Sequence, residues 1–200
     1  TNMSGDWGLY CGPGLWYDYE KELIHIRLAP TGIKEFGEDN YQGESDPRKL
    51  KLIISGGTEG PALKIEGARH VRVQDLVIRG VRRAWAPVEI SDSQDIELDH
   101  LTLYGGATCF SVKSTRDLRL LHCAVRGPSA PWNTRTHQKY RGADATLFSV
   151  GYDSQQSENF EMAYCEFTDC HDGVFIGNVR NVKMHHCLVD NINDDAIFLT

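Results

Sequence analysis

Two short segments near the end of the sequence repeat one pattern, and this pattern decides the fold. Residues 170–176 read CHDGVFI, residues 193–199 read NDDAIFL, and the two segments begin 23 residues apart. Each places polar and acidic residues in front of an apolar stretch that has the length of a short β-strand. Recurrence at a fixed interval indicates that each segment belongs to one unit of an internal repeat.

The repeat extends back to about residue 61, and each unit contains three strand-like segments. The first kind recurs at residues 63–65, 88–90, 110–112, 148–150, 174–176 and 197–199. The second recurs at residues 71–73, 96–98, 118–120, 160–162 and 182–184. The third recurs at residues 76–78, 101–103, 123–125, 165–167 and 187–189. Equivalent positions are 25 residues apart from Ile65 to Ile90 and 22 apart from Ile90 to Val112.

Intervals of this length, with apolar faces that one unit cannot bury alone, indicate a solenoid. Three short strands per unit, without a helical pattern between them, predict an all-β parallel β-helix of about six coils, stacked about 4.8 Å apart. The preference for right-handed crossovers between parallel strands predicts a right-handed coil. A β-sandwich of short strands is the alternative, but it requires hairpin turns and leaves the regular three-strand spacing unexplained.

Two segments are predicted to lie outside the regular repeat. Residues 1–60 contain aromatic residues among glycines and one alternating run at 22–28, which indicates a separate β-rich and loop segment. Residues 61–200 are predicted to form the β-helix, interrupted by a loop insertion at 128–146. Long loops on rigid scaffolds often carry function, so we expect the insertion to wall a groove along the sheet of first strands.

The composition narrows the classes of partner. The chain is 40% hydrophobic and 24% charged, with a formal net charge of -7. This acidic balance disfavours general binding to nucleic acid or to a membrane surface, and no apolar run approaches membrane-spanning length. We therefore expect neither nucleic acid nor a membrane as a partner.

Because the chain begins at Thr1 and stops inside a strand at Thr200, we expect a processed or partial chain whose last coil is covered by further coils or by another chain.

Side chains at equivalent positions are expected to form ladders from coil to coil. Cys123, Cys165 and Cys187 share an inward position, which predicts buried thiols rather than disulfides. A corner ladder of short polar residues precedes the second strands at Asp95, Asp117, Asn159 and Asn181. An outward ladder precedes the third strands at Asp75, His100, His122, Tyr164 and His186. Surface stacking is the expected role of these histidines, with metal binding as the alternative.

The candidate catalytic residues are His171, Asp172, Asp194 and Asp195. The repeat places Asp172 and Asp195 in one ladder, and His171 and Asp194 in the neighbouring ladder. Because like charges this close cannot all ionise cheaply, we expect at least one carboxyl pKa of the cluster to be raised, as a general acid requires. The alternatives are acidic residues that serve only as corners, or a cation site without catalysis. No cofactor and no metal are expected, although Ca²⁺ remains open.

The same residues carry a family resemblance. The run from His171 to Ile176, followed by Asp194-Asp195, resembles the Asn-Thr-Asp-Gly and Asp-Asp motifs of polygalacturonases, which belong to the pectin-lyase-like superfamily of right-handed parallel β-helices. The resemblance implies inverting hydrolysis of an acidic polysaccharide, with Asp194 as general acid and with Asp172 and Asp195 activating water. Cys170 and His171 stand where that family has Asn and Thr. A polysaccharide substrate favours an extracellular or periplasmic location.

Two other functions remain open. A polysaccharide lyase would need a base and a cationic clamp for the uronate carboxylate, and a non-catalytic polysaccharide-binding module would need neither. The candidate substrate-binding residues are Lys113, Phe175, Phe198, Trp132, Arg135, His137, Lys139 and Arg141. Phe175 and Phe198 are expected to face outward in adjacent coils as a platform for sugar stacking, and the last five belong to the insertion.

Overall fold

A computed structural model describes residues 14–30, 32, 41–52, 60–79, 86–105, 108–127, 146–150, 155–192 and 194–200. The chain divides into two compact units, Thr1–Ile53 with Ala130–His137, and Ile54–Ser129 with Gln138–Thr200. Within the described ranges, the only helical segment is a short 3₁₀ turn at Pro47–Lys49. No helix in that part of the chain has the length and apolar character needed to cross a membrane.

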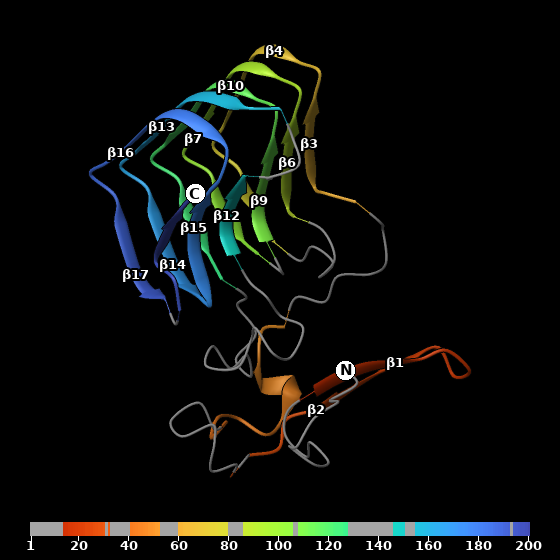
Figure 1. Ribbon diagram of the computed structural model, residues 1–200. Helices are drawn as coiled ribbons and strands as arrows, with labels where there is room; N and C mark the ends of the chain where they lie inside the picture. Colours follow the sequence, from red (N-terminus) through yellow and green to blue (C-terminus); the bar gives the residue numbers. More distant parts are fainter. Residues whose placement is uncertain are drawn as a thin grey trace. The chain divides into compact units, whose positions relative to one another are not determined.

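The second unit is a parallel β-solenoid built from three sheets (Figure 1). The first sheet has six strands: β3 (Leu63–Glu66), β6 (Val88–Ser91), β9 (Thr108–Lys113), β12 (Thr146–Val150), β15 (Asp172–Ile176) and β18 (Ile197–Leu199). The second sheet has five: β4 (Arg69–Gln74), β7 (Gln94–Asp99), β10 (Arg116–Leu121), β13 (Ser157–Ala163) and β16 (Val179–His185). The third also has five: β5 (Val77–Ile78), β8 (Thr102–Tyr104), β11 (Ala124–Arg126), β14 (Glu166–Cys170) and β17 (Leu188–Ile192).

Each strand pairs in parallel with the equivalent strand of the next coil. For example, Leu118 of β10 lies between Ile96 of β7 and Phe160 of β13. The chain therefore visits the three sheets in turn, which confirms the predicted all-β parallel solenoid with three strands per coil. The prediction of about six coils corresponds to five complete coils, with β18 as the first strand of another.

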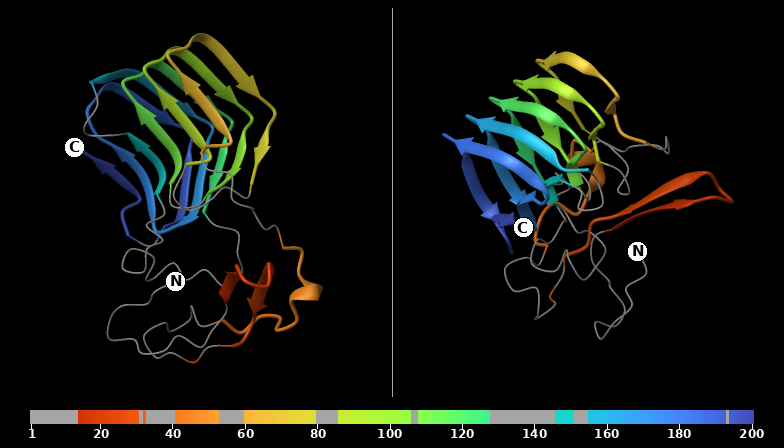
Figure 2. Two further views of the ribbon diagram at one scale, coloured as in Figure 1. Left: turned by 90° about the vertical axis from the view of Figure 1, so that its right-hand side faces the viewer. Right: turned by 45° about the horizontal axis from the view of Figure 1, so that its top comes forward.

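Figure 2 shows how the strands of the three sheets stack coil upon coil. Apolar side chains that these sheets enclose form the core. Successive side chains of a strand point to opposite faces, so the alternating pattern sends one set inward, such as Ile96 and Leu98 of β7, both 0% exposed. Cys123 and Cys165 lie in the same column, and all the cysteines that the structure describes are free thiols. The Sγ atoms of Cys123 and Cys165 each donate to a carbonyl oxygen two residues earlier, at 3.3 Å. Buried thiols therefore satisfy their weak donors without disulfides.

The corners between strands use the left-handed backbone region. Both corner ladders predicted from the sequence have positive φ, for example 54° at Asp117, 59° at Asn159 and 52° at His122. Asn, Asp and His tolerate this region better than most residues, which explains why they recur at the corners. Asn159 Nδ2 donates to Asp117 Oδ1 at 2.8 Å, and Asn181 Nδ2 donates to Asn159 Oδ1 at 3.0 Å. The corner side chains thus tie one coil to the next.

The first unit contains an antiparallel hairpin of β1 (Gly14–Asp18) and β2 (Leu23–Arg27). Asp18 Oδ1 accepts hydrogen bonds from the backbone N–H groups of Glu20 and Lys21, both at 3.1 Å, which stabilises the turn. The rings of Trp16 and His25 stack with centroids 4.4 Å apart, a cross-strand pair of the kind that stabilises isolated hairpins.

Candidate functional site

The candidate catalytic residues lie where the chain enters β15 and β18. The pairing of Val174 with Ile197 sets the register of these strands. Hydrogen bonds from Gly173 N to Asp195 O and from Asp194 N to His171 O, both 2.9 Å long, continue this register in front of the strands. His171 and Asp194 therefore occupy equivalent positions in successive coils, and Asp172 is equivalent to Asp195. Asp172 also pairs with Thr146 of β12 on its other side.

His171, Asp172 and Asp194 form a compact cluster. His171 Nε2 lies 3.4 Å from Asp194 Oδ2 and 3.8 Å from Asp172 Oδ1. One potential ligand atom from each of the three residues lies within 4.8 Å of the others. An imidazole nitrogen placed between two carboxylates can hold a proton and pass it on, which is the basic requirement of general acid–base catalysis.

The members of this cluster differ in their access to solvent. His171 and Asp172 are buried, with 3% and 7% of their surface exposed, whereas 43% of the Asp194 side chain is exposed. Asp172 shares the inward alternation of Val174 and Ile176, so its carboxylate lies on the core side of β15. A ligand can therefore reach Asp194 directly, while His171 and Asp172 lie behind it. The fourth predicted residue, Asp195, is exposed and is not part of the cluster.

The adjacent cysteine does not supply a nucleophile. Cys170 directly precedes His171, an order that could suggest a Cys–His pair. Burial raises the pKa of the Cys170 thiol to about 12, so the thiol stays protonated near neutral pH. Because the thiolate is the nucleophilic form, the reactive groups of this region are the carboxylates and the imidazole.

Phe175 and Phe198 are neighbours on the outward face of the first sheet. They pair directly in β15 and β18, and their rings stack with centroids 4.9 Å apart and an interplanar angle of 25°. Both side chains are half-buried. Asp172 precedes Phe175 by three residues, so the aromatic pair and the carboxylate cluster belong to the same two coils. An apolar surface beside acidic groups suits a sugar ring, whose C–H face packs on aromatic carbon.

The structure does not bring Lys113 into this cluster. Lys113 ends β9, whereas Thr108 at the start of β9 is in line with Thr146 and Asp172. Five residues of extended strand correspond to about 16 Å, so Lys113 lies at the opposite edge of the sheet from the cluster. Five predicted substrate-binding residues lie outside the described residues: Trp132, Arg135, His137, Lys139 and Arg141. The insertion at 128–146 falls outside them too, except for Thr146.

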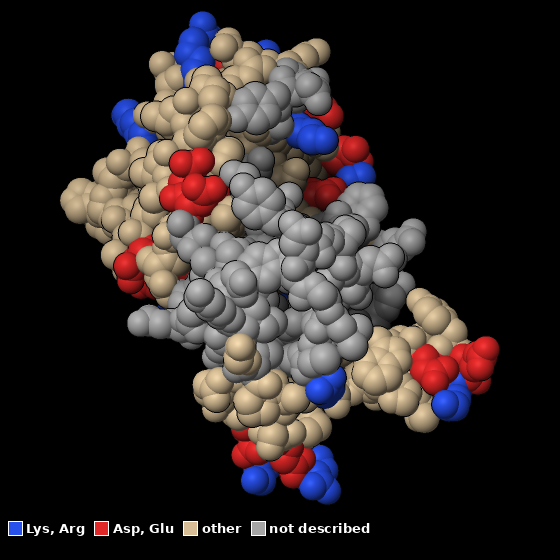
Figure 3. All heavy atoms as spheres, turned by 60° about the horizontal axis from the view of Figure 1, so that its bottom comes forward, with Lys and Arg blue, Asp and Glu red and all other residues tan. Residues whose placement is uncertain are grey.

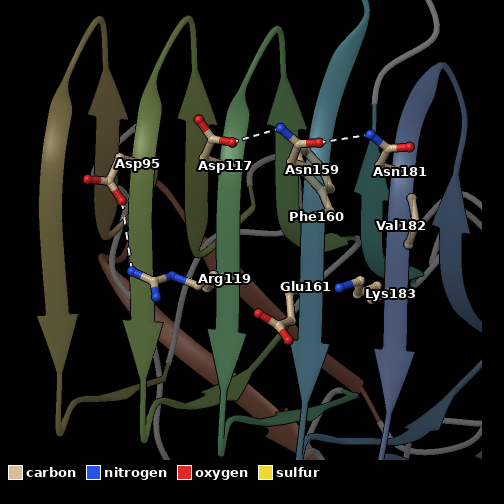
Figure 4. A pocket seen from close by; sticks show the side chains of 9 residues that line it. All are labelled: Asp95, Asp117, Arg119, Asn159, Phe160, Glu161, Asn181, Val182 and Lys183. Carbon is tan, nitrogen blue, oxygen red and sulfur yellow. Dashed lines mark hydrogen bonds and ion pairs between the residues drawn. The ribbon is translucent and has the colours of Figure 1, made fainter.

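An open hollow of about 770 Å³ lies on the second sheet, over β10, β13 and β16. Figure 4 shows Asp117, Asn159 and Asn181 in a row across these strands, with Arg119, Glu161 and Lys183 in a second row. The sequence predicts the corner ladder, but it contains no signal for a hollow. A hollow depends on how far the side chains of several coils project from the sheet. On the face drawn in Figure 3, acidic and basic side chains gather in small separate groups.

No protein-family model, no curated protein and no solved structure matches this sequence. The resemblance to polygalacturonases therefore rests on the two acidic motifs alone.

Proposed function

We propose that this β-solenoid cleaves an acidic polysaccharide by hydrolysis at the site formed by His171, Asp172, Asp194 and Asp195. The observation that carries the proposal is the position of His171 Nε2 between two carboxylates of successive coils, at 3.4 and 3.8 Å. A solenoid presents equivalent groups at each coil, so a chain of sugars running along the first sheet passes both the carboxylates and the aromatic pair.

We assign different roles to these four residues because their side chains differ in exposure to solvent. Asp194 and Asp195 are exposed and can touch the glycosidic bond and the attacking water, so we assign them the catalytic roles. His171 and Asp172 are positioning residues, because they lie behind Asp194 and fix the orientation of its carboxylate. Inverting enzymes hold their two carboxyl groups roughly 6.5–9.5 Å apart. Oxygen atoms of Asp172 and Asp194 lie within 4.8 Å of each other, which favours Asp195 over Asp172 as the group that activates water.

Among the cations that the structure describes, the position of Lys113 favours hydrolysis over β-elimination. A lyase needs a positive group on the carboxylate of the same sugar whose proton is removed. Lys113, the described candidate for such a clamp, lies at the other edge of the sheet from Asp172, about five residues along β9. A single sugar cannot contact both residues.

The test is turnover of a panel of uronate-containing and neutral polysaccharides by the full chain, with Asp194→Asn and Asp195→Asn as variants. We expect each variant to lower kcat by roughly 10²–10⁴-fold, the usual contribution of a general acid or base, with little change in KM. Asp190→Asn is the matched control, because Asp190 is an exposed carboxylate on β17, the strand that precedes Asp194 and Asp195. Unchanged turnover in both site variants contradicts the proposal.

The products separate hydrolysis from elimination. Hydrolysis gives new reducing ends only, whereas elimination also gives a 4,5-unsaturated sugar that absorbs ultraviolet light. The appearance of that absorbance would replace hydrolysis with the lyase reaction.

A non-catalytic polysaccharide-binding module is the second candidate, and the hollow on the second sheet favours it. Its row of Asp117, Asn159 and Asn181 presents amides and a carboxylate at coil spacing to a polar ligand. If the wild type binds a polysaccharide without turnover, and if Lys183→Ala weakens that binding while Asp194→Asn does not, the module replaces the enzyme.

A further inference from the structure

A second cluster of ionisable side chains lies where β7 and β10 end, at the corner between the second and third sheets. Asp99 is the last residue of β7, and His100 and His122 directly follow β7 and β10. The pairing of Asp99 with Leu121 and a hydrogen bond of 3.0 Å from His100 N to Leu121 O fix the two histidines in successive coils. The positions of all three residues are thus set by the solenoid backbone.

Both imidazoles contact the same carboxylate oxygen. His100 Nδ1 lies 2.8 Å and His122 Nδ1 lies 3.0 Å from Asp99 Oδ1. The two rings stack with centroids 4.6 Å apart and an interplanar angle of 22°. The two Nδ1 atoms therefore converge on one oxygen, and one potential ligand atom from each of the three residues lies within 4.8 Å of the others.

Asp99 is held in a fixed orientation by Arg72. Arg72 Nη2 donates to the other carboxylate oxygen, Oδ2, at 2.9 Å, and Arg72 Nε lies 2.8 Å from Glu97 Oε1. Because Arg72 occupies Oδ2, the oxygen that faces the imidazoles is Oδ1.

We propose that Asp99, His100 and His122 bind one divalent transition-metal ion, with Zn²⁺ as the reference ion, through Oδ1 and the two Nδ1 atoms. Two imidazoles and one carboxylate are a donor set that such ions prefer. Tetrahedral ligands about 2.1 Å from one ion lie roughly 3.4 Å apart, so the distances of 2.8 and 3.0 Å between Oδ1 and the nitrogens must lengthen by a few tenths of an ångström when the ion binds. Each neutral imidazole keeps its single proton, on Nε2, when Nδ1 binds the metal.

The surroundings leave the proposed metal site open to solvent. The side chains of His100 and His122 are 57% and 46% exposed, so water can complete the coordination. The ladder continues as Tyr164, whose ring stacks on His122 at 5.2 Å. The positions equivalent to Asp99 in the next two coils are Leu121 and Ala163, which offer no ligand. The position after them is His185, whose ring nitrogens contact His186 Nδ1 at 2.9 Å and Glu161 Oε1 at 3.2 Å. This site is separate from the carboxylate cluster of β15, and the proposal does not depend on the proposed function.

The test is titration of Zn²⁺ into the full chain, first freed of metal with a chelator, by isothermal titration calorimetry. We expect one ion per chain for the wild type, and a loss of affinity of more than roughly 100-fold in both His100→Ala and His122→Ala, beyond what a change outside the ligands produces. His70→Ala is the matched control. His70 Nδ1 lies 2.7 Å from Asp95 Oδ2 as a single His–Asp pair at another corner, and its substitution should leave the affinity unchanged.

A measurement on the wild type avoids any effect of the substitutions on folding. In ¹⁵N-labelled protein, Zn²⁺ should shift the Nδ1 resonances of His100 and His122 and leave their Nε2 atoms protonated. The proposal is overturned if the wild type binds no Zn²⁺ or if the shifted resonances belong to other histidines. It is also overturned if binding persists in both histidine variants, as it would for the cluster of His171, Asp172 and Asp194 or for thiolate ligands.

Discussion

Gly173 lets β15 pass close to the segment that leads into β18. A Cβ atom at this position would collide with the carbonyl oxygen of Ala196, the same oxygen that accepts a hydrogen bond from Val174 N at 3.0 Å. We expect Gly173→Ala to lower the free energy of unfolding by about 1–3 kcal/mol, the usual effect of overpacking, as measured by urea denaturation. Gly14→Ala is the control, because nothing lies within 4 Å of the added atom there. Wild-type stability in Gly173→Ala would show that the two coils separate without strain.

Asp99 should make the stability depend on pH in the acid range. Its pKa of about 2 in the folded protein lies below the value of about 3.9 for an unfolded chain. Its contribution is therefore complete above about pH 4 and disappears as the pH falls toward 2. We expect the difference in unfolding free energy between the wild type and Asp99→Asn to shrink over this range, as measured by urea denaturation at several pH values. A constant difference would mean that the contacts with His122 and Arg72 do not favour the charged form.

The sequence predicts which residues share a ladder, but not how deeply each is buried. The ladder of Asp172 and Asp195 follows from counting residues within the repeat. Asp99 follows the inward Leu98, so alternation places it on the outside of β7. It is nevertheless only 9% exposed, because Arg72 from one neighbouring coil and His122 from the other cover it. Contacts between coils decide burial at such positions, and a one-dimensional pattern does not contain them.

At the level of elements, each corner is stabilised by its ladder and by residues that accept a positive φ. Asn159 has a φ of 59° and makes hydrogen bonds to both Asp117 and Asn181. We expect Asn159→Ala to lower the unfolding free energy by about 2–3 kcal/mol, because Ala loses both hydrogen bonds and is strained in this region. Asn159→Gly removes the hydrogen bonds without the strain and should lose about 1 kcal/mol less. Equal losses in the two variants, measured by thermal or urea unfolding, would assign the effect to the ladder alone.

The sequence predicts well those strands that recur at a regular interval along the chain. The strands of the solenoid follow from the interval of 22–26 residues, except in the coil that carries the insertion, where Val112 and Val150 are 38 residues apart. The hollow over β10, β13 and β16 has no such signal, because it arises from the relative heights of side chains in different coils. The same reason explains why the sequence does not distinguish the open Asp194 from the covered Asp172, although both belong to the predicted cluster.

At the level of the whole solenoid, stability should vary along the axis, because each coil contacts only its neighbours. Leu98 and Leu101 in the middle coils are 0% exposed, whereas Leu76, at the inward position before β5, is 42% exposed and Leu199 of β18 is 68% exposed. Coils with less buried apolar surface open at lower free energy. We expect amide hydrogens of β7 and β10 to exchange at least about tenfold more slowly than those of β5 and β18, as measured by hydrogen-exchange mass spectrometry.

Leu120→Ala should then speed exchange in β7 and β13 more than in β4 and β16, since the lost contacts belong to adjacent coils. Uniform exchange in all coils would instead mean that the solenoid opens as one cooperative unit, with coupling that extends beyond the nearest coil.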